Sequence, residues 1–399
     1  MKAGWKTVRI GEILDKTENI DPTSFPEREY DYIDVSSVSN KSFSVEETQR
    51  IKGKDAPSRA RKLVRTNDVL FATIRPTLQR IAIIPRHLDG QICSTGYFVL
   101  RPKEVISSRF IYYVLMTDSF RSQMERLQKG ASYPAVTDGD VRDQEIPLPP
   151  LAEQKRIVAL LDEAFAGIDE AKAKARQKLY DAQSITDSHI HSIFTKPGPD
   201  WGKKALSELC TFSSGNTPSK SNSGYWNGTI PWISGRDMKS TRLSDSHLHI
   251  SKSAVEEYGT RVAEPGTLLV LVRGMGLAHG AQVAELTAPC AFNQDIRGIH
   301  ANAGILPRYL LFALKHGINT SDSVLSSAAH GTLKIDSNEL HSLPISFPPL
   351  KQQERIVASI DTLTDESQSL VKIFIKQVAA LDELRKALLT QAFAGELTA

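Results

Sequence analysis

The sequence has few of the features that mark exported, disulfide-stabilised or membrane-bound proteins. Its three cysteines lie far apart in 399 residues and form no Cys-x-x-Cys pair, which indicates neither a disulfide scaffold nor a cysteine zinc site. The N-terminus has no apolar core of signal-peptide length. No later stretch approaches the roughly 18 apolar residues that a membrane span requires. These absences predict a soluble protein of the reducing cytoplasm.

Recognised catalytic motifs are also missing. No HExxH, GxSxG or paired metal-ligand spacing occurs. GNTPSKS at 215–221 has the outer spacing of a phosphate-binding loop but a serine before the lysine, and RGMGLAHG at 273–280 lacks the third glycine of a dinucleotide loop. His247 and His249 alternate along a strand-like stretch, a pattern more typical of a surface or base-contacting strand than of a metal site. The chain is therefore predicted to bind and not to catalyse.

Net charge gives little guidance, because a formal value of +3 is too small to indicate a nucleic-acid partner by itself. The positions of the charges are more informative. RIKGKDAPSRARKLVR at 50–65 holds seven lysines and arginines against one acid, Asp55, a density that suits contacts with phosphates. The alternative is a solvated basic face near a loop.

A later stretch, SSGNTPSKSNSGYWNGTIPWISGRDM at 213–238, is less basic but rich in flat, amide and hydroxyl side chains. Such residue types suit base edges and the sugar-phosphate backbone. The alternative for Trp226 and Trp232 is that they are core aromatics that hold the loop, with the polar residues around them as the readers. The polar and aromatic candidates are Lys220, Tyr225, Trp226, Asn227, Trp232 and Arg236.

The chain repeats itself at long range. PPLAEQKRIV at 149–158 returns as PPLKQQERIV at 348–357, and further matches lie roughly 200 residues apart in the same order. They pair Trp5 with Trp201, NDVLFATIR at 67–75 with PGTLLVLVR at 265–273, and SRFIYYVLM at 108–116 with PRYLLFALK at 307–315. The simplest interpretation is two copies of one module.

Each module ends in Pro-Pro followed by a long helical pattern. Residues 152–194 contain no proline and one glycine, and about 43 helical residues would extend on the order of 64 Å. Apolar residues at 4,3 spacing predict that the two helices bury their seams against each other; the alternative is an amphipathic helix packed on each globular core. The predicted seams, interrupted by Ser367 and Gln377, are Ile157, Leu161, Ala164, Ile168, Ala171 and Ala175, and Ile356, Ile360, Leu363, Leu370, Phe374, Leu381, Leu384 and Leu388.

These patterns resemble the specificity subunit of type I restriction-modification systems, from Trp5 to Leu397. DVLFATIRP at 68–76, PLPPLAEQKRIV, FPPLKQQERIV and LLTQAFAGEL at 388–397 are similar to segments of that family. The stretch at 213–238 resembles the opening of one of its target recognition domains. The residues that carry this last likeness are Gly215, Thr217, Pro218, Tyr225, Trp226, Gly228, Pro231, Trp232 and Asp237.

The resemblance implies an α+β fold in which two pseudo-repeated α/β target recognition domains are separated by two long antiparallel helices. The expected divisions are recognition domain 1 at 1–150, a central helix at 151–196, recognition domain 2 at 197–349 and a C-terminal helix at 350–399. The subunit would be non-catalytic and would read a bipartite site on double-stranded DNA with an unread spacer.

The resemblance also implies partners. Two modification subunits would supply S-adenosylmethionine and the adenine methyltransferase site, and two restriction subunits, where present, would add translocation and cleavage driven by ATP with Mg. The chain itself would bind no cofactor and no metal. The alternatives are an assembly protein whose globular halves bind protein or carbohydrate, and, less favoured because the motifs are missing, a nuclease or methyltransferase.

The residues predicted to contact DNA come from both modules. Arg75 and Arg273 each close a matching apolar run, so they are predicted readers or phosphate contacts; the alternative is that each braces the fold through a carboxylate. The full predicted set is Arg59, Arg61, Lys62, Arg75, Arg80, Ser132 and Tyr133 in the first module, and Ser219, Lys220, Tyr225, Arg236, Arg273, His330 and Lys334 in the second.

Overall fold

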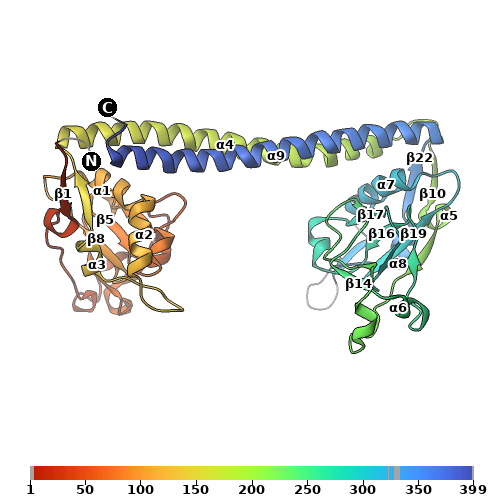
Figure 1. Ribbon diagram of the computed structural model, residues 1–399, viewed down its shortest axis with the longest axis horizontal. Coiled ribbons are helices and arrows are strands. Elements are labelled where there is room, and N and C mark those ends of the chain that lie inside the picture. Colours follow the sequence, from red (N-terminus) through yellow and green to blue (C-terminus); the bar gives the residue numbers. More distant parts are fainter. Residues whose placement is uncertain (1–3, 322, 328–332, 398–399) are drawn as a thin grey trace. The chain divides into compact units, whose positions relative to one another are not determined.

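The computed structural model describes residues 4–321, 323–327 and 333–397. The chain divides into two compact units: Met1–Gln177 with Phe374–Ala399, called here the first unit, and Lys178–Ile373, the second unit. Each unit contains a globular α/β part together with portions of two long helices, α4 (Leu151–Thr195) and α9 (Leu350–Ala394) (Figure 1). The first unit is therefore assembled from both ends of the chain.

The first unit is built on two small sheets and a ribbon. In the four-stranded sheet β3-β2-β7-β4, β2 runs parallel to β7 and the other neighbours are antiparallel. The second sheet, β6-β5-β8, is antiparallel, and β1 pairs with β9. The strands are β1 (Lys6–Arg9), β2 (Glu29–Ile33), β3 (Gln49–Lys52), β4 (Ala60–Leu63), β5 (Val69–Ala72), β6 (Ile81–Ile83), β7 (Ile92–Ser94), β8 (Tyr97–Leu100) and β9 (Glu145–Leu148).

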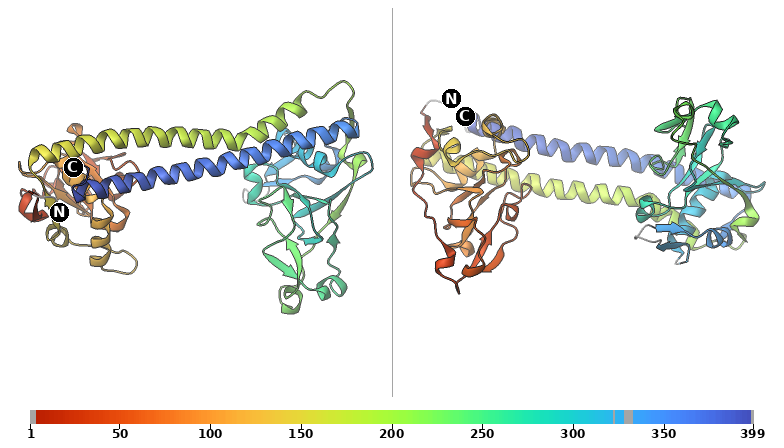
Figure 2. Two further views of the ribbon diagram at one scale, coloured as in Figure 1. Left: turned by 45° about the horizontal axis from the view of Figure 1, so that its top comes forward. Right: turned by 90° about the horizontal axis from the view of Figure 1, so that it is seen from below.

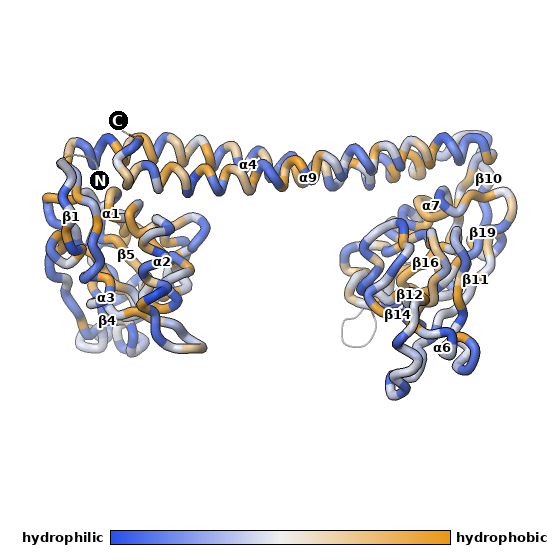
Figure 3. The backbone as a smooth tube through the Cα atoms, in the orientation of Figure 1, coloured by the Kyte–Doolittle hydropathy of each residue, from blue (hydrophilic) through white to orange (hydrophobic). Residues whose placement is uncertain are grey.

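The core of the first unit forms around β5, whose four residues, Val69–Ala72, are all buried. A short fully apolar strand suits a position covered on both faces. On one side Phe71 meets Phe120 of α2 edge to face, with ring centroids 5.3 Å apart, and Figure 3 shows the hydrophobic colouring of β5 and α1. The helices are α1 (Ser108–Leu115), α2 (Asp118–Leu127) and α3 (Asp138–Arg142), with 3-10 turns at Ile10–Ile13, Pro22–Ser24, Val35–Ser37, Gly53–Asp55, Pro76–Leu78 and Arg86–Leu88.

The second unit repeats this plan with additions. Its sheets are the four-stranded β14-β12-β18-β15, the five-stranded β11-β19-β16-β17-β13, and the ribbons β10-β22 and β20-β21. The strands are β10 (Gly202–Ala205), β11 (Cys210–Ser214), β12 (Ile230–Ile233), β13 (Arg242–Leu243), β14 (Leu248–Ile250), β15 (Val262–Ala263), β16 (Leu268–Leu271), β17 (Val283–Leu286), β18 (Cys290–Phe292), β19 (Ile296–Ala301), β20 (Leu325–Ser327), β21 (Leu333–Ile335) and β22 (Pro344–Phe347). The helices are α5 (Leu206–Leu209), α6 (Lys252–Glu256), α7 (Pro307–Thr320) and α8 (Ser337–Ser342), with 3-10 turns at Ser223–Trp226 and Met275–His279.

The two globular parts share one topology. The parallel pair β12–β18 with antiparallel β14 and β15 corresponds to β2–β7 with β3 and β4. The antiparallel set β17-β16-β19 corresponds to β6-β5-β8, and β10–β22 corresponds to β1–β9. The predicted fold class, two pseudo-repeated α/β parts with two long helices, is confirmed.

The two long helices run antiparallel beside each other within each unit (Figure 2). In the first unit, Asp169 of α4 pairs with Arg385 of α9 at 3.1 Å, and Lys172, one turn later, pairs with Asp382, one turn earlier. In the second unit, the Ser367 hydroxyl donates to the Ala182 carbonyl. Ser367, which interrupts the apolar seam in the sequence, is therefore buried there and finds its partner on the neighbouring backbone.

The seam prediction is wrong at two positions. Leu370 and Leu384 are 40% and 47% exposed, because a straight helix with 3.6 residues per turn drifts by about 20° per heptad against a 3.5-residue repeat. Ile157, Leu161, Ile168, Ala175 and Ile360 are buried, and Ala164, Ala171, Ile356, Leu363, Phe374, Leu381 and Leu388 are half-buried.

Candidate nucleic-acid interface

The loops that follow parallel strands β12 and β18 meet at one edge of the second unit, because the carboxyl ends of parallel strands lie together. They border a hollow of about 480 Å³. Residues 234–236 come from the first loop and residues 293–295 from the second. The remaining lining residues are Thr217, Lys220, Trp232, His247 and Leu248.

Part-buried and exposed hydrogen bonds fix these loops. Asp237 accepts hydrogen bonds from the backbone N–H of Ser234 at 2.9 Å and of His247 at 3.0 Å, so one carboxylate ties two loops together. Trp232 Nε1 donates to the Asn216 carbonyl at 3.0 Å, and Trp226 Nε1 donates to the Ser219 carbonyl at 3.2 Å. The interpretation of both tryptophans as supports of the loop is therefore the better one.

The hollow brings together three of the candidates predicted from this stretch, namely Trp232 and the two cations. Lys220 and Arg236 both line it and are exposed, and neither has a carboxylate partner in the described part of the chain. Two others lie elsewhere. Ser219 is exposed beside Ser221, with their hydroxyls 2.7 Å apart, and Tyr225 lies near Tyr258, with ring centroids 5.9 Å apart.

In the first unit, the basic stretch at 50–65 is not the unopposed cluster that the sequence suggested. Acids from distant segments pair with six of its seven bases: Glu29 with Arg50, Glu27 with Lys52 and Lys54, Asp21 with Arg61, Asp138 with Lys62, and Glu18 with Arg65. Arg59 is exposed and has no carboxylate partner among the residues described. Most of these pairs are exposed, where an ion pair contributes little, so a phosphate could replace the acid.

Two of the predicted DNA contacts are used inside the fold. Lys62 is 15% exposed in its side chain, and its Nζ donates to the Tyr97 carbonyl at 2.6 Å as well as to Asp138 at 2.7 Å. Arg80 Nη1 donates to the carbonyls of Val38 at 2.7 Å and Val35 at 3.3 Å. Both side chains brace the loops at the ends of β2 and β7, and a direct contact with DNA stays a prediction.

Arg75 and the loop at 129–135 lie together although they are distant in sequence. Arg75 follows β5 in a left-handed conformation with φ 50°, which is costly for a residue with a side chain. Its guanidinium lies 5.2 Å from the ring centroid of Tyr133, and its N–H donates to the Pro134 carbonyl at 2.7 Å. Tyr133 is 71% exposed and Ser132 is also exposed. Three predicted contact residues thus form one exposed cluster.

The second unit has the same backbone contact with its arginine one position earlier. Arg273 follows β16 and forms a backbone bridge with Lys334, as Ile74 does with Ala135, so the structural counterpart of Arg75 is Gly274. His330, a predicted contact residue, lies outside the described residues. Neither Arg75 nor Arg273 has a carboxylate partner in the ranges that the structure covers, so the alternative of a brace through a carboxylate gains no support.

The described residues offer little basis for a metal site or a reactive cysteine. His249 Nε2 lies 2.7 Å from Asp245, but no group of three or more potential metal ligands occurs within the described ranges. All three cysteines are buried. Burial raises the pKa of the Cys210 thiol to about 12 and that of Cys290 to about 11, so neither forms a thiolate near neutral pH. Within the part that the structure describes, no helix is both long and apolar enough to cross a membrane.

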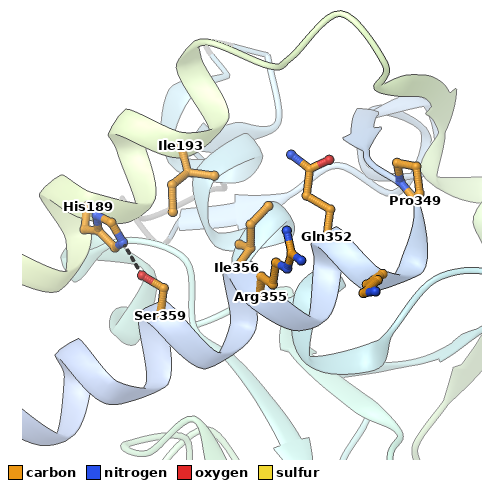
Figure 4. A pocket seen from close by; sticks show the side chains of 8 residues that line it. His189, Ile193, Pro349, Gln352, Arg355, Ile356 and Ser359 are labelled. Atoms are coloured by element: carbon orange, nitrogen blue, oxygen red, sulfur yellow. Dashed lines mark hydrogen bonds between the residues drawn. The ribbon is translucent and has the colours of Figure 1, made fainter.

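A second hollow in the second unit lies between α4 and α9 and has a volume of about 530 Å³. Figure 4 shows His189 and Ile193 of α4 facing Ile356 and Ser359 of α9, with His189 Nε2 and Ser359 Oγ 3.0 Å apart. Its rim also carries Lys351, Gln352 and Arg355, which are exposed. This surface is basic and partly apolar, and it lies on the helices and not on the strand ends.

Sequence reasoning missed two kinds of residue. Gln294, which lines the first hollow, follows no periodic pattern and belongs to no recognised motif. Gln154 and Gln353 are fully buried and occupy the same place in the ten-residue repeat. That repeated glutamine was a signal for a structural role in both units.

Comparison with known proteins places the fold in a family. The type I restriction modification DNA specificity domain matches residues 2–179 and again 199–378. The specificity subunit of the type I restriction enzyme EcoR124I/EcoR124II from Escherichia coli is 30% identical over 227 residues, 56% of this chain and 54% of that subunit. This chain therefore spans about half the length of that relative. The HindI specificity subunit of Haemophilus influenzae is 21% identical over 480 residues, covering 98% of this chain and 99% of that one.

Solved structures agree. The crystal structure of the HsdS subunit from Thermoanaerobacter tengcongensis is 30% identical, with a TM-score of 0.65 over 99% of this chain and 98% of that one. A chain from work on complex assembly and conformational transition of the type I R-M system is 30% identical, with a TM-score of 0.87 over 99% of both chains. With two copies of the matching domain and the same fold, this chain belongs to the family of type I restriction-modification specificity subunits.

Proposed function

We propose that this chain reads a bipartite, asymmetric DNA site with an unread spacer, one half-site by each globular part, and positions methyltransferase subunits on that site. The observation that carries the proposal is that one topology presents different side chains at the same strand ends. The turn after β7 carries Thr95 and Gly96, whereas the turn after β18 carries residues 293–295. A common frame with different exposed residues suits two different half-sites.

The contacts divide by chemistry. Lysines and arginines fix phosphates, while amides, hydroxyls and flat side chains read base edges in the major groove. Lys62 and Arg80 are best assigned to supporting loops. The proposed contacts are Arg59, Arg61, Arg75, Ser132 and Tyr133 in the first unit and Ser219, Lys220, Tyr225, Arg236, Arg273 and Lys334 in the second.

The helices provide a surface for partner subunits. Tyr180, Ile185, Ile373 and Ile375 are exposed apolar residues on α4 and α9, and exposed apolar surface marks protein contacts. Two modification subunits would dock there in the cytoplasm and supply S-adenosylmethionine and the methyltransferase site. Restriction subunits would add ATP and Mg. The recognition parts are then 1–150 and 197–349, and the helical parts 151–196 and 350–399.

Methylation mapping tests the proposal. Genomic DNA from cells that carry this chain and its neighbouring modification subunit is compared with DNA from cells that lack only this chain. A split motif with methylated adenine in both halves, lost with the chain, is the expected result. Unchanged methylation in the presence of an active modification subunit would contradict the proposal.

Arg75→Ala is expected to weaken binding of the assembled complex to all DNA sequences about equally. Loss of one phosphate contact lowers the slope of log K against log salt by about one. Binding titrations at several salt concentrations measure this slope. Arg9→Ala removes the same charge from an exposed position on β1 and should leave the slope unchanged. A change of preference at a single base pair would instead assign Arg75 to base reading.

A further inference from the structure

The turn between β18 and β19 holds Gln294 in a fixed backbone. The N–H of Ile296 donates to the Asn293 carbonyl at 3.3 Å, and the N–H of Asp295 donates to Asn293 Oδ1 at 3.1 Å. Asn293 itself is buried and tied to β12, because its N–H donates to the Ile233 carbonyl at 3.0 Å. Gln294 is exposed between these anchored residues, so its side chain is presented from a rigid base.

The Gln294 amide is oriented by one neighbour. Thr217 Oγ1 donates a hydrogen bond to Gln294 Oε1, and no partner of Nε2 occurs among the described residues. A glutamine amide carries two N–H donors and an oxygen with two lone pairs. Both donors and one lone pair therefore remain for a ligand, side by side in one plane.

Two cations line the same hollow as this amide. Lys220 and Arg236 line the same hollow of about 480 Å³ and have no acidic partner within the described ranges. The one acid that lines it, Asp295, lies 3.4 Å from Asn293 Nδ2. A polyanionic backbone can thus be held beside Gln294 while a base edge meets the amide.

We propose that Gln294 is a base-reading residue of the second unit and that it selects adenine in the major groove. Nε2 would donate to adenine N7 while Oε1 accepts from N6, the bidentate pairing that an amide makes with this base alone. Thr217 is a positioning residue that fixes the amide. This inference rests on the proposed function, because it names how one of the two half-sites is read.

The first unit cannot read DNA in this way from the corresponding turn. Thr95 occupies the position of Gln294, because the residues that follow them, Gly96 and Asp295, accept equivalent hydrogen bonds from the N–H groups of Thr73 and Val272. Thr95 is exposed, but its single hydroxyl cannot make the bidentate pairing of an amide with adenine. The effect of Gln294 is therefore confined to one half-site.

The experiment uses the purified complex of this chain with its modification subunits and a pool of duplex DNA randomised over both half-sites. Sequencing of the bound fraction gives the preference at every position. The wild type should require an A·T pair at one position. Gln294→Ala should accept any base pair at that position. The expected loss of discrimination there is about 5- to 150-fold, from the usual contribution of a bidentate pair. The other half-site and the salt dependence should not change.

Further variants separate reading from folding. Thr217→Val removes the orienting hydroxyl and should weaken discrimination at the same position, while Thr217→Ser should keep it. Asn338→Ala, at an exposed amide on α8 of the same unit, is the matched control. If Gln294→Ala does not assemble with the modification subunits, the comparison of Thr217→Val with Thr217→Ser tests the proposal in its place.

The adenine assignment is overturned if Gln294→Ala binds the unchanged motif, or if the variant loses discrimination at a G·C pair instead. A wild-type complex without any sequence preference overturns the proposed function, and this inference with it.

Discussion

Replacement of Gln353 by alanine is expected to destabilise the second unit by about 3–5 kcal/mol. The side chain is 0% exposed. Its Oε1 accepts from the N–H of Leu306 at 2.9 Å, and its Nε2 donates to the carbonyls of Pro348 at 2.8 Å and Gly304 at 3.1 Å. Alanine leaves three backbone groups without partners, each at a cost of about 1–3 kcal/mol when water cannot reach them.

Urea unfolding followed by tryptophan fluorescence measures this loss, because Trp201, Trp226 and Trp232 lie in the second unit and Trp5 alone in the first. Gln352→Ala, at the exposed neighbouring position, is the matched control and should change stability by less than about 0.5 kcal/mol. A loss below about 1 kcal/mol in Gln353→Ala would show that water replaces the amide and that the site is not dry.

The same clamp exists in the first unit. Gln154 Oε1 accepts from the N–H of Ser107 at 2.9 Å, and its Nε2 donates to the carbonyls of Pro149 at 2.9 Å and Val105 at 3.0 Å. In both units the clamp holds the first turn of a long helix to the segment that enters α1 or α7. Each recognition part is thereby fixed to its helix at a defined point.

Asp68→Ala should destabilise the first unit by about 3–5 kcal/mol, the usual result of removing one partner from a buried ion pair. Asp68 is 2% exposed and receives two hydrogen bonds of 2.9 Å from the Arg101 guanidinium and one of 2.8 Å from the N–H of Arg65. The hydrogen bond with Asp68 is the main reason that the pKa of Arg101 lies above its ordinary value. Arg101 would stay charged in the variant, half-buried beside a site that no longer carries an acid.

Hydrogen exchange of peptides that span β5 and β8 reports on this unit. Glu18 is the other acid that pairs with Arg101, and its side chain is about half exposed. Glu18→Gln removes the charge of that exposed pair and should lower the stability of the unit by less than about 1 kcal/mol. Replacing Asp68 and Arg101 together by apolar residues should cost less than Asp68→Ala alone, because no unpaired charge is then buried. Equal losses in the single and double variants would assign the effect to packing.

The repeat and the helices could be predicted because both rest on patterns local to the chain. Proline-free stretches with regular apolar spacing gave α4 and α9, and matched strands gave the shared topology. The pattern was misleading where periodicity drifts, as at Leu370 and Leu384. The pattern also did not predict that Ser367 would be buried in the seam, where its hydroxyl donates to a carbonyl of α4.

The candidate interface was harder to predict, since it depends on pairs that no local count can show. Glu18, Asp21, Glu27 and Glu29 lie well outside the basic stretch at 50–65 and still neutralise most of it. Gln294 becomes a candidate reader only when the parallel pairing of β12 and β18 brings its turn beside Lys220 and Arg236. Arg75 and Tyr133 could each be named from sequence, but not their contact.

The make-up of the units has a consequence for biosynthesis. The second unit, Lys178–Ile373, is continuous in sequence, and its core cluster uses no residue from outside that range, so this core can form without the other unit. The core of the first unit includes Leu389 and Ala392, and Phe393 packs on Phe110 with ring centroids 5.2 Å apart. The part that leaves the ribosome first is therefore the last to be completed, and until then the apolar side chains that Leu389, Ala392 and Phe393 cover are open to a chaperone.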